Sequence, residues 1–182
     1  FYDLKYQNLF LKDIKKILNK DGLFILEHAD LLSIIKNCLF DTICHEHLEY
    51  YSLKSLKYLL NKAGLKISNL SFNQINGGSI EVDVVKKNSK YKECKNLINW
   101  VLESERINRY NEIKKHKNFF QECKNHKKLL KKLLITLKKQ NKKIVGYGAS
   151  TKGNVLLQFC GINSKIINNI AEVNKYKFNR YT

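Results

Sequence analysis

The chain contains no proline, no methionine and a single tryptophan, and none of its apolar runs approaches the ~20 residues of a membrane-spanning helix. We therefore expect no membrane partner. The five cysteines include no CxxC or other close metal-ligand pair, and no signal peptide is visible. An odd, scattered set is typical of reduced thiols in a cytoplasmic protein rather than of disulfides. The cysteines are Cys38, Cys44, Cys94, Cys123 and Cys160.

Lysine is abundant, whereas arginine is scarce. Lys and Arg total 34 against 16 Asp and Glu, a formal charge of +18, and only three of the 34 are arginine. A strongly basic chain is typical of nucleic-acid binding, but arginine is the residue favoured for bidentate phosphate and guanine contacts. We therefore expect no nucleic-acid partner and keep a basic, helical nucleic-acid-binding module as an alternative. A basic surface also suits a small substrate that carries phosphates.

Residues 1–88 have the pattern of alternating helix and strand. Apolar positions between residues 3 and 19 have helical spacing. The run at 23–26 is short and apolar, which predicts a buried parallel strand in a sheet with helices on both faces. Glu27 and His28 follow at the expected carboxyl end of this strand, where open α/β sheets bind ligands.

A helix and a hairpin are predicted next. Ser52 is a good N-cap for a helix that Gly64 would end. Strands are expected at 65–67 and 80–84, and Asn76-Gly77-Gly78 between them is a strong turn signal, because glycine adopts positive φ at little cost. A turn alone explains these glycines, and contact with a substrate is the alternative.

Residues 90–143 contain no glycine or proline and are highly charged, which predicts one or two long helices. We expect these helices to connect two domains, with their lysines facing solvent. A mainly apolar stripe, with one polar interruption, steps by three and four along the segment. It comprises Phe120, Cys123, Lys127, Leu130, Leu134 and Leu137.

Four elements are expected after this connector. They are a strand over 143–148, a small-residue loop over 149–154, a helix over 155–159 and a strand over 166–173. This order is typical of a Rossmann-like unit, in which N–H groups at the start of the helix suit a phosphate. The glycine spacing, GxGxxxxG over 146–153, fits neither the dinucleotide fingerprint nor the Walker loop. An NAD(P)-dependent oxidoreductase is therefore an alternative, and a tight turn without a ligand explains the spacing equally well.

Residues 44–51 hold a thiol, two imidazoles, two carboxylates and two phenols in eight positions. Imidazole titrates near neutrality, so a histidine beside a carboxylate can move protons at working pH. If the segment is extended, His45 and His47 point to one side and Cys44 and Glu46 to the other. Ordinary surface residues are one alternative. A zinc site is another, in which Cys44 and both histidines would need a fourth ligand such as His28.

Four segments occur in an order that is more specific than any one of them. They are Asp41 to Ser52, Asn76-Gly77-Gly78-Ser79-Ile80, Gly146 to Asn154, and Ala171 to Asn174 leading to Arg180-Tyr181-Thr182. Together they resemble the SAM-dependent sugar C-methyltransferases that act on nucleotide-linked keto-deoxysugars. For residues 1–88 this resemblance implies an α/β fold, the second half of a class I, Rossmann-like methyltransferase sheet. It further implies a helical connector over about 89–142 and the start of a second, substrate-binding Rossmann-like α/β domain over 143–182.

The resemblance implies S-adenosyl-L-methionine as the cofactor and a nucleotide sugar as the substrate. No SAM loop occurs in this chain, so the cofactor is expected to be bound mostly by residues upstream of Phe1. Zinc is expected only in a further N-terminal domain, with no metal site in this chain. Because the chain starts at Phe1 and ends shortly after an expected strand, we expect an internal fragment of a longer protein.

The family's functional pattern, Tyr-His-Glu-His, implies roles for individual residues. Its last histidine falls on His47, the expected general base, with Glu46 as an orienting or substrate-binding group. Cys44 stands where the family has Tyr and is a weaker hydrogen-bonding group, so the enzyme either binds its sugar differently or is impaired. The remaining residues expected to contact the substrate are His45, Tyr50, Asn76, Gly148, Ala149, Ser150, Lys152 and Asn154.

Overall fold

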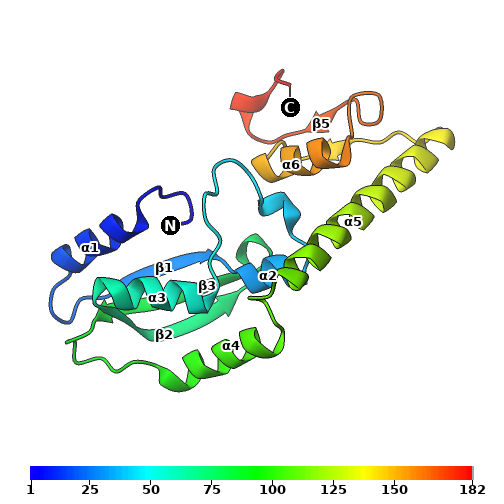
Figure 1. The fold of residues 1–182 in the computed structure, drawn as a ribbon. Helices are drawn as coiled ribbons and strands as arrows, with labels where there is room; N and C mark the ends of the chain where they lie inside the picture. Colours follow the sequence, from blue (N-terminus) through cyan, green and yellow to red (C-terminus); the bar gives the residue numbers. More distant parts are fainter. Residues whose placement is uncertain (182) are drawn as a thin grey trace. The chain divides into compact units, whose positions relative to one another are not determined.

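The computed structural model describes residues 1–181, which form two compact units. Unit 1 comprises Phe1–Leu39 and His45–His116, and unit 2 comprises Phe40–Cys44 and the residues from Lys117 onward. Helices and strands are mixed along the chain, so the predicted α/β class is confirmed (Figure 1). The domain boundary expected between residues 88 and 89 stays a prediction, and residues 89–116 lie within unit 1.

Unit 1 contains a three-stranded sheet with the order β1-β3-β2. Its strands are β1 (Phe24–Ala29), β2 (Leu65–Asn73) and β3 (Ser79–Lys86), and its helices are α1 (Gln7–Ile17), α2 (Leu31–Lys36), α3 (Leu53–Ala63) and α4 (Lys95–Ile107). Strand β3 is antiparallel to both neighbours, so β1 and β2 run in the same direction. The core lies between one face of the sheet and α1, α3 and α4, where Leu11, Leu56 and Ile98 are buried (Figure 1).

Strand β1 forms where the apolar run predicted a strand, but its predicted parallel pairing and continuous burial are wrong for the described residues. It pairs antiparallel with β3, with Phe24 opposite Val84. Its burial alternates, and the side chain of Ile25 is 57% exposed. Successive side chains of a strand point to opposite faces, and among residues 1–181 the core forms on only one of them.

Backbone geometry confirms two predictions in unit 1. Ser52 starts α3 through a reciprocal capping box, and Gly64 ends the helix with φ of 79°. Between β2 and β3 the chain makes the short 3-10 turn η2 (Ile75–Gly77). Gly78 then has φ of 139°, and a Cβ atom there would lie 2.5 Å from Cβ of Ser33. Both the backbone angle and the packing therefore require glycine at this position.

Unit 2 contains most of a long helix together with a small parallel sheet. The elements are η1 (Phe40–Thr42), α5 (Ile113–Lys139), β4 (Gly146–Tyr147), α6 (Thr151–Cys160), β5 (Ile170–Ala171) and η3 (Lys175–Lys177). Strands β4 and β5 pair in parallel, which confirms the predicted order of strand, glycine turn, helix and strand. Helices α4 and α5 confirm the prediction of one or two long helices.

The bounds of three elements in unit 2 differ from the prediction. Strand β4 covers only Gly146–Tyr147 of the strand expected over 143–148. Helix α6 begins four residues earlier than expected, because the Ser150 hydroxyl accepts the N–H of Gly153 and caps the helix. Strand β5 is much shorter than expected. The N–H groups of Ile166 and Ile167 donate to the carbonyl oxygen of Asn163, which makes a turn where the strand was predicted.

Aromatic and helical packing joins the parts of unit 2. Phe40 in η1 lies against His126 of α5 and Phe159 of α6, with ring centroids 5.4 and 5.0 Å apart. On the predicted stripe of α5, Cys123 and Leu134 are buried, whereas Phe120 is exposed. Across residues 1–181, no helix combines the length and the hydrophobicity that a membrane span requires.

Candidate functional site

Residues 45–51, which we predicted to carry the chemistry, lie in unit 1 and form no helix or strand. A turn at His45 and Glu46 interrupts the segment. The segment is therefore not extended, and the expected alternation of its side chains does not apply. His45 and Glu46 are exposed, and His47 and Tyr50 are half-buried. Within the described part of the chain, no three His, Cys, Asp or Glu side chains are grouped in a way that could hold a metal ion.

His47 lies against two phenol rings. Its imidazole is edge-on to Tyr2, with centroids 4.4 Å apart, and to Tyr50, with centroids 6.3 Å apart. The carbonyl oxygen of Tyr2 also accepts the N–H groups of Leu48 and Glu49, at 2.9 and 3.2 Å. Tyr2 therefore contacts the imidazole and holds the backbone that follows it. Sequence reasoning missed Tyr2, because no local pattern links residues so far apart in the chain.

The buried end of β1 lies beside this segment. His28 is only 3% exposed, its Nδ1 is 2.8 Å from the carbonyl oxygen of Ala29, and its ring is edge-on to Tyr51. Burial lowers the pKa of His28 and so favours its neutral form. Burial raises the pKa of Tyr51 to about 12, and Glu49 adds to this shift. His28 Nε2 has no hydrogen-bond partner among the described residues.

Backbone hydrogen bonds tie three predicted features together. The N–H of Leu31 donates to the carbonyl oxygen of Tyr51 at 3.2 Å, and the N–H of Asp30 donates to that of Gly78 at 3.1 Å. The end of β1, the segment 45–51 and the turn before β3 are thus neighbours. These contacts explain Gly78 as part of a structural turn, whereas substrate contact by Asn76 stays a prediction.

A buried carboxylate from α4 holds the start of α3. Glu105 is 1% exposed, and its two oxygens accept the N–H groups of Leu53 at 2.6 Å and Lys54 at 3.3 Å. Burial raises the pKa of Glu105, although these N–H bonds oppose the shift. Ser52, the N-cap of α3, directly follows Tyr51, so Glu105 fixes one end of residues 45–51, the candidate catalytic segment. Its role was not visible in the sequence.

In unit 2, the glycine turn between β4 and α6 is held by side chains that follow β5. Gly148 has φ of 88°, and its N–H donates to the carbonyl oxygen of Ala171 at 2.8 Å. Glu172 accepts the N–H of Ala149 at 2.7 Å, and Lys177 Nζ donates to the carbonyl oxygen of Ala149 at 2.7 Å. An added Cβ at Gly148 would meet nothing within 4 Å, so the backbone angle alone requires this glycine.

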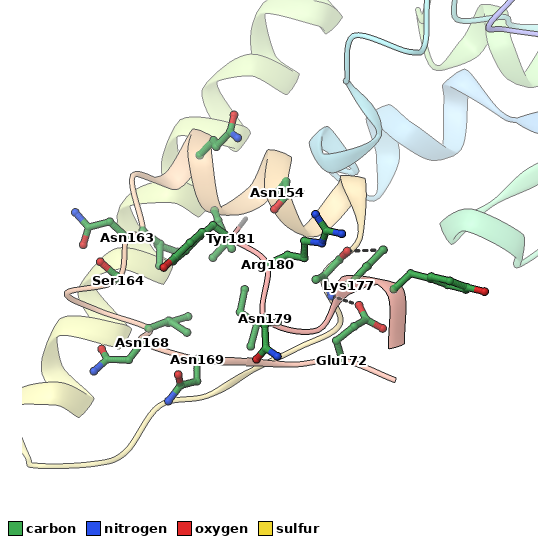
Figure 2. A pocket seen from close by; sticks show the side chains of 17 residues that line it. Asn154, Asn163, Ser164, Asn168, Asn169, Glu172, Lys177, Asn179, Arg180 and Tyr181 are labelled. Atoms are coloured by element: carbon green, nitrogen blue, oxygen red, sulfur yellow. Dashed lines mark hydrogen bonds between the residues drawn. The ribbon is translucent and has the colours of Figure 1, made fainter. Parts of the chain in front are cut away.

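A cavity of about 840 Å³ lies between α6 and the segment that follows β5 (Figure 2). Of the residues predicted to bind the substrate, Ala149 and Asn154 line this cavity, whereas Gly148, Ser150 and Lys152 are not among its lining residues. Substrate binding by all five stays a prediction. Three charged residues that sequence reasoning did not assign to a site also line it. They are Glu172, Lys177 and Arg180. Side-chain amides complete much of its polar surface, from Asn154, Asn163, Asn168, Asn169 and Asn179.

Comparison with known proteins identifies the family. The sequence profile of the C-methyltransferase C-terminal domain matches residues 74–182, so the chain belongs to this family. The chain is also similar to the C-methyltransferase NovU of Streptomyces niveus, with 31% identity over 157 residues. The aligned part is 86% of this chain but 37% of NovU, so the chain spans little more than a third of that relative. The resemblance to C-methyltransferases predicted from the motifs is confirmed.

Proposed function

We propose that this chain is part of a cytoplasmic SAM-dependent C-methyltransferase that acts on a nucleotide-linked keto-deoxysugar, with His47 as its general base. Family membership supports the reaction class. The observation that carries the assignment of the base is the position of His47, half-buried between the rings of Tyr2 and Tyr50. A base in this position is reachable from solvent and fixed by its neighbours.

Methyl transfer to carbon needs a carbon nucleophile. A sugar carbon becomes one when a base removes a proton next to a ketone, so the site must accept that proton and stabilise the enolate. His47 takes the proton in this proposal, and Glu46 orients the imidazole or the substrate. When bound, SAM supplies the electrophilic methyl group. Its binding loop is expected upstream of Phe1, and we assign it no residue of this chain.

The two units bind different parts of the substrate in this proposal. The order β1-β3-β2, with a reversed strand between two strands of the same direction, supports assigning unit 1 to the end of a class I methyltransferase sheet. His45, Tyr50 and Asn76 contact the sugar. Unit 2 holds the nucleotide portion through the turn at 148–154 and the cavity beside it. A zinc-binding domain precedes both units in the longer protein.

Replacing His47 with alanine in the full-length protein tests the proposal. Transfer of a methyl group from SAM to a 3- or 4-keto sugar nucleotide should fall on the order of 10²–10⁴-fold, because general-base catalysis contributes about that much. Circular dichroism and the unfolding midpoint should be unchanged. His45→Ala is the matched variant and should raise KM more than it lowers kcat. Wild-type turnover by the His47→Ala protein would remove His47 from the mechanism.

A further inference from the structure

The turn before α6 occupies the place where a Rossmann-like unit commonly binds a phosphate, but the chain places its own carboxylate there. One oxygen of Glu172 accepts the N–H of Ala149 at 2.7 Å. The other oxygen accepts the N–H groups of Val173 at 2.8 Å and Asn174 at 3.0 Å. A phosphate at the Ala149 N–H would have to displace this carboxylate and would meet its negative charge.

Neighbouring groups hold the turn in this arrangement. Lys177 donates to the carbonyl oxygen of Ala149, so oppositely charged side chains bond to both polar groups of one residue. The N–H of Gly153, another donor at the start of α6, is bonded to the Ser150 hydroxyl. The N–H groups of Ala149 and Gly153 thus already have partners within the chain, and an anion that bonded to either of them would have to break these bonds.

Glu172 retains capacity to bind a neutral donor. A carboxylate offers about four acceptor positions, and N–H groups of Ala149, Val173 and Asn174 occupy three of them. Glu172 also lines the cavity beside α6, as Figure 2 shows. A hydroxyl group can donate into the remaining position, whereas a phosphate offers another acceptor.

The same cavity offers cationic groups away from this carboxylate. Arg180 and Lys177, both in the segment that follows β5, line it (Figure 2). A guanidinium group suits phosphate because it presents several N–H donors in a planar fork. The cavity therefore has an acceptor for hydroxyls at Glu172 and a donor for an anion at Arg180.

We infer that Glu172 binds a hydroxyl group of the ligand, and that the anionic part of that ligand lies at Arg180 instead of at the N–H groups of Ala149 and Gly153. This inference rests on the proposed function and deepens it, because it names the chemical groups of a nucleotide sugar that unit 2 binds. The hydroxyl belongs either to the ribose or to the attached sugar. Arg180 and Glu172 are thus specificity-determining residues of opposite charge.

Calorimetric titration of the full-length protein with three probes tests this inference. The probes are UDP, which carries ribose hydroxyls, glucose 1-phosphate, which carries sugar hydroxyls, and inorganic pyrophosphate, which carries neither. Glu172→Gln should weaken the binding of a hydroxyl-bearing probe by about tenfold or more, since a hydrogen bond to a charged group is worth at least that. Pyrophosphate should bind more tightly to the same variant, because the Ala149 N–H is less firmly held and no negative charge repels the anion.

Comparing the three probes shows whether the hydroxyl belongs to the ribose or to the sugar, and whether the inference holds. A loss confined to UDP assigns the hydroxyl to the ribose, and a loss confined to glucose 1-phosphate assigns it to the sugar. Arg180→Gln should weaken all three probes, and Glu122→Gln on α5 is the control with the same charge change outside the cavity. Equal weakening of all three probes by Glu172→Gln, or no change, overturns the inference. A wild-type protein that binds neither hydroxyl-bearing probe instead refutes the placement of the nucleotide sugar in unit 2.

Discussion

Glu105 in unit 1 and Glu172 in unit 2 make the same kind of bond in different surroundings. Each carboxylate accepts backbone N–H groups at or just before the start of a helix. Burial raises the pKa of Glu105 in spite of these bonds. For Glu172, N–H bonds from Asn174 and then Ala149 lower the pKa, because burial is weaker there. Desolvation thus outweighs the N–H bonds at Glu105, whereas the N–H bonds outweigh desolvation at Glu172.

The two regions are consequently held by different means. The candidate catalytic segment is held by the buried carboxylate of Glu105 and by the backbone carbonyl oxygen of Tyr2. Salt and solvent reach buried groups poorly. The turn before α6 is held by Glu172 and Lys177 near the surface. When a buried acceptor is removed, the N–H groups that it bonded cannot bond to water in its place. Exposed N–H groups that lose an acceptor can bond to solvent instead. We therefore expect loss of the Glu105 carboxylate to alter stability and loss of the Glu172 carboxylate to alter ligand recognition.

The largest expected effect on stability is that of Glu105→Ala. It leaves the N–H groups of Leu53 and Lys54 without their acceptor and should lower the free energy of unfolding by about 3 kcal/mol. Urea denaturation measures this change. Glu103→Ala is the control, because it removes only an exposed ion pair with Arg106 on the same helix and should lower the free energy of unfolding far less. Similar losses in both variants would refute the supporting role of Glu105.

The two helix caps give a smaller, matched contrast. Ser52 caps α3 while buried, and Ser150 caps α6 while exposed. Ser52→Ala should lower the free energy of unfolding by about 1–2 kcal/mol and Ser150→Ala by about 0.5–1 kcal/mol. Urea denaturation of both variants under one condition provides the comparison. A larger loss for Ser150→Ala would contradict the view that burial sets the cost.

The pH dependence of stability should have opposite signs for the two carboxylates. Glu105 has a pKa raised above its ordinary value, so its contribution is fully present below that value and is lost as pH rises through the folded-state pKa. Glu172 has a lowered pKa, so its contribution is present above the ordinary value and is lost as pH falls through the folded-state pKa. Urea denaturation from pH 3 to 8, with Glu105→Gln and Glu172→Gln as references, measures both. If the contributions of both carboxylates to the free energy of unfolding changed with pH in the same direction, the contrast between Glu105 and Glu172 would be refuted.

The smallest expected effect on global stability is that of Lys177→Met. This variant removes an exposed hydrogen bond to Ala149 and should change the free energy of unfolding by less than about 0.5 kcal/mol. Amide hydrogen exchange in the turn before α6 should nevertheless become faster, because one of its two side-chain anchors is lost. Lys175→Met in the same 3-10 segment is the control. Unchanged exchange in Lys177→Met would show that Glu172 holds the turn alone.

Local chemistry made several elements predictable. Ser52 and Gly64 marked both ends of α3, and the glycines before β3 marked the hairpin, because capping and positive φ depend on few neighbouring residues. Helix α6 was predicted to begin too late, although Ser150 is a capping residue, because the small residues after it were assigned to a loop. Strand β1 was placed correctly, but its partner was not, since an apolar run does not specify the strand beside it.

The amino-acid pattern alone was enough for the α/β class, for long helices between residues 90 and 143 and for the family, whereas the roles assigned to His47 and Glu46 stay predictions. The contacts of Tyr2 with His47, of Glu105 with α3 and of Glu172 with Ala149 emerged only from the folded chain. Periodicity and capping act over a few residues and so can be read directly. These three contacts join residues that are distant in the chain, and their existence depends on how whole elements pack.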